Sequence, residues 1–200
     1  MVIIARDSNE IPRFLLTDAS GNLNVLLSDG TTTAVIDPES GSLSVDSATH
    51  QRVINSNMWI SSYLWSAVAA AGSVFFHIKV GANKNPHGVI RMSCQAESTF
   101  YIYENPTLTG DGTALTNVCE NRQTTAVPNT ACFRDPAITA NGLQLEIGKL
   151  GVGGRFTAAG TTIENGGYFL LKKGEDYLIR VDNDDGAAQD FSITYMWHEE

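Results

Sequence analysis

The sequence predicts an all-β chain: an antiparallel β-sandwich or jelly roll of about eight strands, preceded by an extended N-terminal β-arm. Three observations predict it. From about residue 57 apolar and polar residues alternate, turn-forming clusters separate these runs at spacings near ten residues, and no amphipathic helix lies between them. Because successive side chains of a strand point to opposite faces of its sheet, such alternation is typical of strands buried on one side.

The first fifty residues differ from the rest, being rich in Asp, Ser, Gly and Thr, and they contain a short repeat. Residues 18–25 (DASGNLNV) and 37–45 (DPESGSLSV) each join a turn signal to a brief apolar alternation. Units this short need another surface to pack against. We therefore interpret residues 1–50 as a docking arm and residues 51–200 as a jelly-roll-like β domain. The arm residues expected to contact a partner are Ile11, Phe14, Leu15, Leu23, Val25, Val35, Leu43 and Val45.

Residues 58–76 (MWISSYLWSAVAAAGSVFF) carry no charge and approach the length of a membrane span. Four serines and Gly72 interrupt the run, and basic flanks are missing. We predict two buried strands joined by a small-residue turn at residues 71–73, and no membrane partner. The short apolar stretch after Met1 is too brief for a signal peptide.

The remaining strands are predicted from the same alternation, and in each the apolar residues are expected to face the core. These residues are Phe76, Ile78 and Val80; Ile90, Met92 and Cys94; Leu143, Leu145 and Ile147; Tyr177, Ile179 and Val181; and Phe191, Ile193, Tyr195 and Trp197. Residues 182–186 (DNDDG) are expected to form a plain hairpin turn between strands 177–182 and 190–197, because they lack the later residues of a calcium loop.

Composition argues against several classes of function. The formal charge of −9 and scattered Lys and Arg residues disfavour a nucleic-acid partner, which requires clustered cations. Cys94, Cys119 and Cys132 match no metal-binding spacing, so we expect buried, reduced thiols. The four histidines are far apart in the sequence, and no nucleophile motif is present. We expect no enzyme activity, cofactor, metal or small-molecule substrate.

Several motifs of residues 45–200 resemble those of the head decoration, or cement, proteins of tailed bacteriophages, which have a jelly-roll domain. The motifs are YENPTLT (103–109), DGTAL (111–115), the pair Asn121 and Arg122, FLLK (169–172), YLIRV (177–181), Asn183, and WHE (197–199). The last departs from the family pattern, since His198 stands where a Tyr is expected.

The resemblance implies a virion structural protein made in the bacterial cytoplasm. It would bind the major capsid protein on the outside of the head as a homotrimer and stabilise the shell. One alternative is another virion component of the tail, neck or head fibre. A second is a carbohydrate-binding jelly roll for host attachment, which predicts that Trp59, Trp65 and Trp197 form an exposed platform; we expect these tryptophans to be buried instead.

Overall fold

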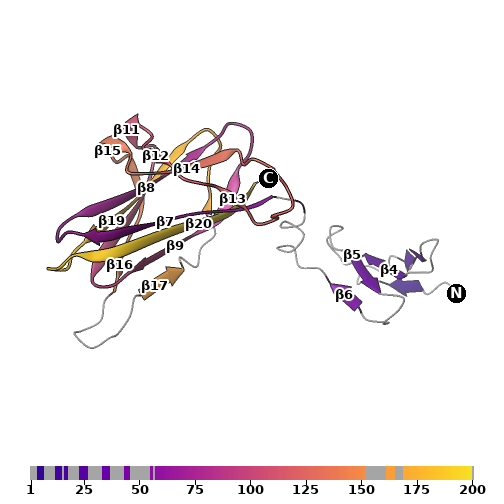
Figure 1. Ribbon diagram of the computed structural model, residues 1–200. Coiled ribbons are helices and arrows are strands. Elements are labelled where there is room, and N and C mark those ends of the chain that lie inside the picture. Colours follow the sequence, from indigo (N-terminus) through magenta and orange to yellow (C-terminus); the bar gives the residue numbers. More distant parts are fainter. Residues whose placement is uncertain are drawn as a thin grey trace. The chain divides into compact units, whose positions relative to one another are not determined.

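The computed structural model describes residue 55, residues 57–151 and residues 169–199, together with the backbone of seven strands outside these ranges. The chain divides into two compact units, Met1–Ile54 and Asn55–Glu200. All regular elements of the described part are β-strands, which confirms the predicted all-β class (Figure 1). None of the described residues belongs to a helix long and apolar enough to cross a membrane.

The first unit contains two small antiparallel sheets. One pairs β1 (Ile4–Arg6) with β2 (Pro12–Phe14). The other runs in chain order through β3 (Leu16–Thr17), β4 (Leu23–Leu26), β5 (Thr33–Ile36) and β6 (Leu43–Val45). Strands β4 and β6 are the apolar ends of the two sequence repeats, and both pair with β5.

The second unit contains eight principal strands. Their bounds are β7 (Met58–Val68), β8 (Ser73–Val80), β9 (Pro86–Cys94), β10 (Ser98–Glu104), β16 (Leu143–Leu150), β17 (Thr161–Glu164), β19 (Asp176–Asn183) and β20 (Gln189–Glu199). Turns separate β7 from β8 and β19 from β20 close to the predicted positions, residues 71–73 and 182–186. The predicted hairpin at residues 182–186 is wrong, because β19 and β20 belong to different sheets. Strand β7 is buried on one face only, and not on both as β8 largely is.

The principal strands form two antiparallel sheets with a jelly-roll order. Sheet I contains β7-β20-β9-β17, and sheet II contains β8-β19-β10-β16. Numbered by their order along the chain, the strands of sheet I are the first, eighth, third and sixth, and those of sheet II are the second, seventh, fourth and fifth. This order arises when one long antiparallel hairpin rolls up into two facing sheets, as in a jelly roll.

The chain between β10 and β16 adds five short strands. A separate ribbon pairs β11 (Thr107–Gly110) with β15 (Ala137–Ala140). Sheet II is extended beyond β8 by β14 (Thr130–Arg134) and then β12 (Thr113–Ala114). Sheet I gains β13 (Val118–Cys119), which pairs with the start of β7, while β18 (Phe169–Leu170) pairs with β9.

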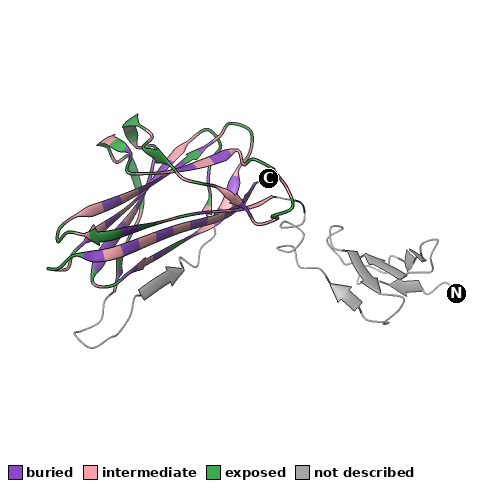
Figure 2. Cartoon of the chain, viewed as in Figure 1, coloured by how far each residue is buried: buried purple, intermediate pink, exposed green. Residues whose placement is uncertain are grey.

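The core lies between the two sheets and follows the predicted faces of most strands, as the buried residues in Figure 2 show. Among the side chains that are almost completely buried are Phe76, Ile78, Ile90, Met92, Ile179, Phe191, Ile193, Tyr195 and Trp197. Apolar residues of both sheets therefore alternate inward as predicted, and each sheet turns its other side outward.

For β16 the predicted inward face is wrong. Leu143, Leu145 and Ile147 are 64%, 43% and 54% exposed. The buried positions of this strand are instead Leu150 and, less completely, Gly148, where an added Cβ would overlap the ring of Phe100. The strand turns Gly148 inward because only a residue without a side chain fits against that ring, and the alternating leucines then face away from the core.

Candidate functional site

The predicted partner-contact residues of the arm fall in the first unit. Phe14 ends β2, Leu23 and Val25 belong to β4, Val35 to β5, and Leu43 and Val45 to β6. Their side chains, and all of Ile11 and Leu15, lie outside the described residues. Their contact with a partner stays a prediction.

An exposed apolar strip lies at one edge of sheet II and was missed as a surface feature in the sequence. It consists of Leu143, Leu145 and Ile147, which we call the β16 ridge. Ile147 stands directly opposite Tyr101 of β10. Tyr101 stacks on Tyr103 with ring centroids 5.9 Å apart, and so the apolar surface continues inward from the ridge.

The guanidinium of Arg180 bounds this surface on its inner side. It lies 5.4 Å from the ring centroid of Tyr101 and donates a 2.6 Å hydrogen bond from Nε to Asp182. The cation is thus held by an aromatic face and a carboxylate at once. The β16 ridge has alternating large side chains, a charged boundary and an edge position, which suit contact with another protein.

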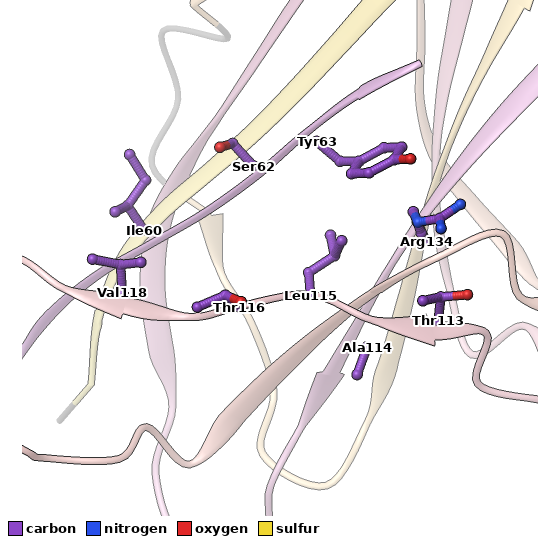
Figure 3. Close-up of a pocket in the computed structure, with 9 residues that line it drawn as sticks. All are labelled: Ile60, Ser62, Tyr63, Thr113, Ala114, Leu115, Thr116, Val118 and Arg134. Carbon is purple, nitrogen blue, oxygen red and sulfur yellow. The ribbon is translucent and has the colours of Figure 1, made fainter. Parts of the chain in front are cut away.

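A groove lies at the opposite side of the sandwich, beside β7 (Figure 3). Its volume is about 520 Å³. The lining residues are Ile60, Ser62, Tyr63, Thr113, Ala114, Leu115, Thr116, Val118 and Arg134. The DGTAL motif supplies one wall, β7 supplies the other, and the Arg134 side chain reaches over the Tyr63 ring at 4.5 Å.

Arg134 is fixed in this groove by its neighbour. Its Nη1 donates to a carboxylate oxygen of Asp135 at 2.8 Å, while the other oxygen of Asp135 accepts a 2.9 Å hydrogen bond from the indole of Trp65. Trp65 belongs to β7, so this chain of contacts joins sheet II to sheet I. The guanidinium has five N–H donors, and the hydrogen bond to Asp135 engages one nitrogen, Nη1.

Two carboxylates of the motifs hold chain segments together. Glu104 receives hydrogen bonds from Lys172 Nζ at 2.6 Å and from the Tyr177 hydroxyl at 3.1 Å. The bond from Lys172 lowers the pKa of Glu104, and burial is the main reason that the pKa of Tyr177 rises to about 12. These residues come from three separate motifs and meet in one cluster.

Glu199 likewise joins two chain segments, near the end of the last strand. Its carboxylate accepts the backbone N–H groups of Asn129 and Thr130, both at 2.8 Å, and the indole N–H of Trp197 at 3.2 Å. It thereby ties the loop before β14 to the last strand. The resembling motifs therefore include residues with structural roles in this sandwich.

The predicted states of the cysteines and tryptophans are confirmed. Cys94, Cys119 and Cys132 are buried and free, and burial raises the pKa of the Cys132 thiol to about 12. Trp59, Trp65 and Trp197 are buried as well. No aromatic platform for sugars is built from these three side chains.

The turn after β19 is organised by an amide. The Asn183 side chain donates to the carbonyls of Val68, Ala69 and Ala187 at 2.9–3.0 Å, which joins the turn to the end of β7.

His87 and His198 stand opposite one another with ring centroids 4.9 Å apart. Within the described ranges, no three His, Cys, Asp or Glu side chains are grouped so that they could hold a metal ion.

Neither family models, curated protein sequences nor solved structures give a match to this chain. The resemblance to decoration proteins consequently rests on the motifs themselves. Several of these motifs lie on β10, β19 and β20, one lies on the wall of the groove, and one lies in the segment that carries Lys172.

Proposed function

We propose that this chain is a non-enzymatic structural protein of a tailed-bacteriophage particle that decorates the outside of the head. The observation that carries the proposal is the β16 ridge, a run of exposed apolar side chains on an edge strand. Contiguous apolar surface of this kind marks protein–protein contact. The motif resemblance supplies the identity of the partner, the major capsid protein.

A decoration protein must add cohesion between neighbouring subunits, which requires buried area and many small contacts. The two compact units of the chain both offer surface for such contacts. Several such chains in a homotrimer would bind with greater avidity than one, because contacts made after the first are intramolecular. We therefore include a homotrimeric assembly in the proposal.

The sequence also indicates two alternative functions. A tail, neck or head-fibre protein would use the same fold, and its place in the particle distinguishes it from a decoration protein. A carbohydrate-binding module for host attachment would need an exposed aromatic platform. The burial of Trp59, Trp65 and Trp197 disfavours that second alternative.

Cryo-electron microscopy of particles carrying the protein tests the proposal directly. We expect density of matching volume on the exterior of the head, in contact with the shell. Density confined to the tail, neck or fibre would move the protein to the first alternative. Failure of the protein to co-purify with any part of the particle would refute both.

A paired substitution tests the role of the β16 ridge. Leu145→Asp with Ile147→Asp is expected to leave folding intact, because both side chains are exposed, and to abolish binding to particles in co-sedimentation. Leu170→Asp is the control, since Leu170 is also an exposed apolar residue but lies on a different strand. Equal loss of binding in both variants would show that added charge, and not the ridge, is responsible.

A further inference from the structure

The two sheets end differently on the side of the groove. Sheet II continues past β8 with β14 and β12, whereas sheet I ends at β7 apart from the two residues of β13. Arg134 of β14 lies over Tyr63 of β7, which shows that β14 faces this edge across the sandwich. In the described part of the chain, the position beside β7 beyond Ile60 has no strand, and the groove of Figure 3 occupies it.

The direction of the β7 backbone can be read from its two ends. The carbonyl of Met58 accepts from Glu120 N–H at 3.0 Å on the β13 side, and the carbonyl of Asn57 accepts from Glu199 N–H at 3.3 Å on the β20 side. Backbone groups of successive strand residues point alternately to the two sides. The N–H and C=O of Ser62 and Leu64 therefore point to the open edge.

From Met58 to Trp65, strand β7 lacks the features that normally protect an edge. Its eleven residues, MWISSYLWSAV, include no charged residue and no proline, and its one register shift against β20 comes only after Trp65. Natural edge strands are usually blocked by charge, proline or a bulge, because free N–H and C=O groups pair readily with another strand. The edge strand β16 is protected in this way, since it carries Glu146 and Lys149 and a register shift.

The groove also has a charge preference. Arg134 is the single charged residue among the nine that line it, and Asp135, which is not one of the nine, pairs with its Nη1 at 2.8 Å. A strand added beside β7 would turn the residue opposite Tyr63 to the same face as Tyr63, because paired residues share a face. That face looks towards sheet II, where the Arg134 guanidinium lies. An acidic side chain at that position would meet the cation.

We propose that the groove beside β7 accepts one extended strand from another polypeptide. The strand pairs with the open backbone groups of Ser62 and Leu64, lies over β14, and places an Asp or Glu side chain against Arg134. It completes sheet I opposite the added strands of sheet II. Recognition is by addition of a β-strand, in which the main chain supplies affinity and the alternate side chains supply specificity.

The probe is a library of random peptides of about nine residues, which span the open part of β7 at roughly 3.3 Å per residue. The library is selected on the full-length chain. We expect enriched peptides with alternating β-branched residues and one acidic residue at a constant position. Backbone chemical shifts of Ser62, Leu64 and Arg134 should change when a selected peptide is added.

Ser62→Pro is the decisive variant. Proline removes the N–H that points to the open edge and leaves the pairing with β20 in place, as edge strands permit. We expect a selected peptide to bind this variant at least about tenfold more weakly, and Ser62→Ala, which keeps the N–H, to bind within about twofold of the unchanged chain. Arg134→Gln should weaken an acidic peptide and leave its Gln or Asn analogue unaffected.

Three results would overturn the proposal. One is a selection that enriches nothing on the unchanged chain above the level on folded Ser62→Pro protein. Another is equal affinity of selected peptides for Ser62→Pro and Ser62→Ala. The third is an oligomer of the chain that dissociates on Ser62→Pro substitution, which would make the occupant a second copy of this chain. Because the selection uses no phage particle, its failure is distinguishable from failure of the proposed function.

Discussion

Glu104 has an electrostatic role that can be measured at the scale of one residue. Lys172 and Tyr177 both donate to its carboxylate, and the contact with Lys172 holds its pKa below the ordinary value of 4.5. The folded state therefore binds a proton at this carboxyl less tightly than the unfolded state. The carboxylate stabilises the fold above about pH 4.5, and that stabilisation is lost as the pH falls through the lowered pKa.

Glu104→Gln removes this titration. We expect the decrease in free energy of unfolding between neutral pH and about pH 3 to be smaller in Glu104→Gln than in the unchanged chain. Urea unfolding at the two pH values measures it. Lys172→Met should flatten the dependence in the same direction, because it removes the main cause of the lowered pKa. Identical pH dependence in all three proteins would contradict the assignment.

Trp197 tests the core at a single side chain. It is 0% exposed and stacks on Tyr195 with ring centroids 4.8 Å apart. We expect Trp197→Ala to lower the free energy of unfolding by about 3–5 kcal/mol, through lost burial and the cavity left behind. Val127→Ala is the control, since Val127 is 86% exposed and should change stability by about 0.5 kcal/mol or less. A loss below about 1 kcal/mol for Trp197→Ala would contradict complete burial.

Single residues show where sequence reasoning succeeds. Burial of Trp197 and Cys132 followed from residue type and alternation, which are local properties. Most contacts of Glu104 and Glu199 could not be predicted, because every partner except Trp197 is 68 to 73 residues away. Their motifs were recognised as patterns without any sign that the residues would meet.

At the scale of elements, alternation identifies a strand but leaves its inward face open. In β19 and β20 the larger apolar residues point inward, as expected. In β16 the deciding residue is Gly148, which fits against the Phe100 ring. A glycine carries no hydrophobic signal, and so the alternating leucines were assigned to the core.

Gly148→Ala tests this account of β16. An added Cβ would overlap the Phe100 ring, which is itself packed in the core, so we expect a loss of about 1–3 kcal/mol in thermal or urea unfolding. Gly186→Ala is the matched control, because an added Cβ there meets no atom within 4 Å. Equal stability of the two variants would show that β16 can shift its face at little cost.

The short strands β12 and β13 were also beyond prediction. Each has two residues, and two residues cannot display a period of two. Both lie in the insertion between β10 and β16, where they form the groove wall. The candidate binding groove therefore arises from elements that only tertiary structure can define.

At the scale of the whole molecule, the division into two units gives a test of the arm. Deletion of residues 1–45 removes strands of the first unit and none of the second. We expect the truncated chain to keep its cooperative unfolding and to lose attachment to phage particles. Circular dichroism and particle co-sedimentation check the two parts. Retained attachment would assign particle binding to the β domain alone.

The jelly-roll class was predictable because many alternating segments without helices leave few other architectures. The order of strands within each sheet was not. Pairings such as Met58 with His198 join opposite ends of the domain, and no local pattern encodes them. The family resemblance added the expectation of a jelly roll, and the order of strands in the two sheets is that of a jelly roll.

The position of β20 between β7 and β9 has a consequence for how the chain reaches its native state. Sheet I cannot close until the eleven residues of β20 are available, since they form its central strand. Folds dominated by such distant pairings fold in roughly milliseconds to seconds, far more slowly than helical bundles. Until then the uncharged β7 lacks its main neighbour, and a growing chain is at its most vulnerable to aggregation before β20 has been synthesised.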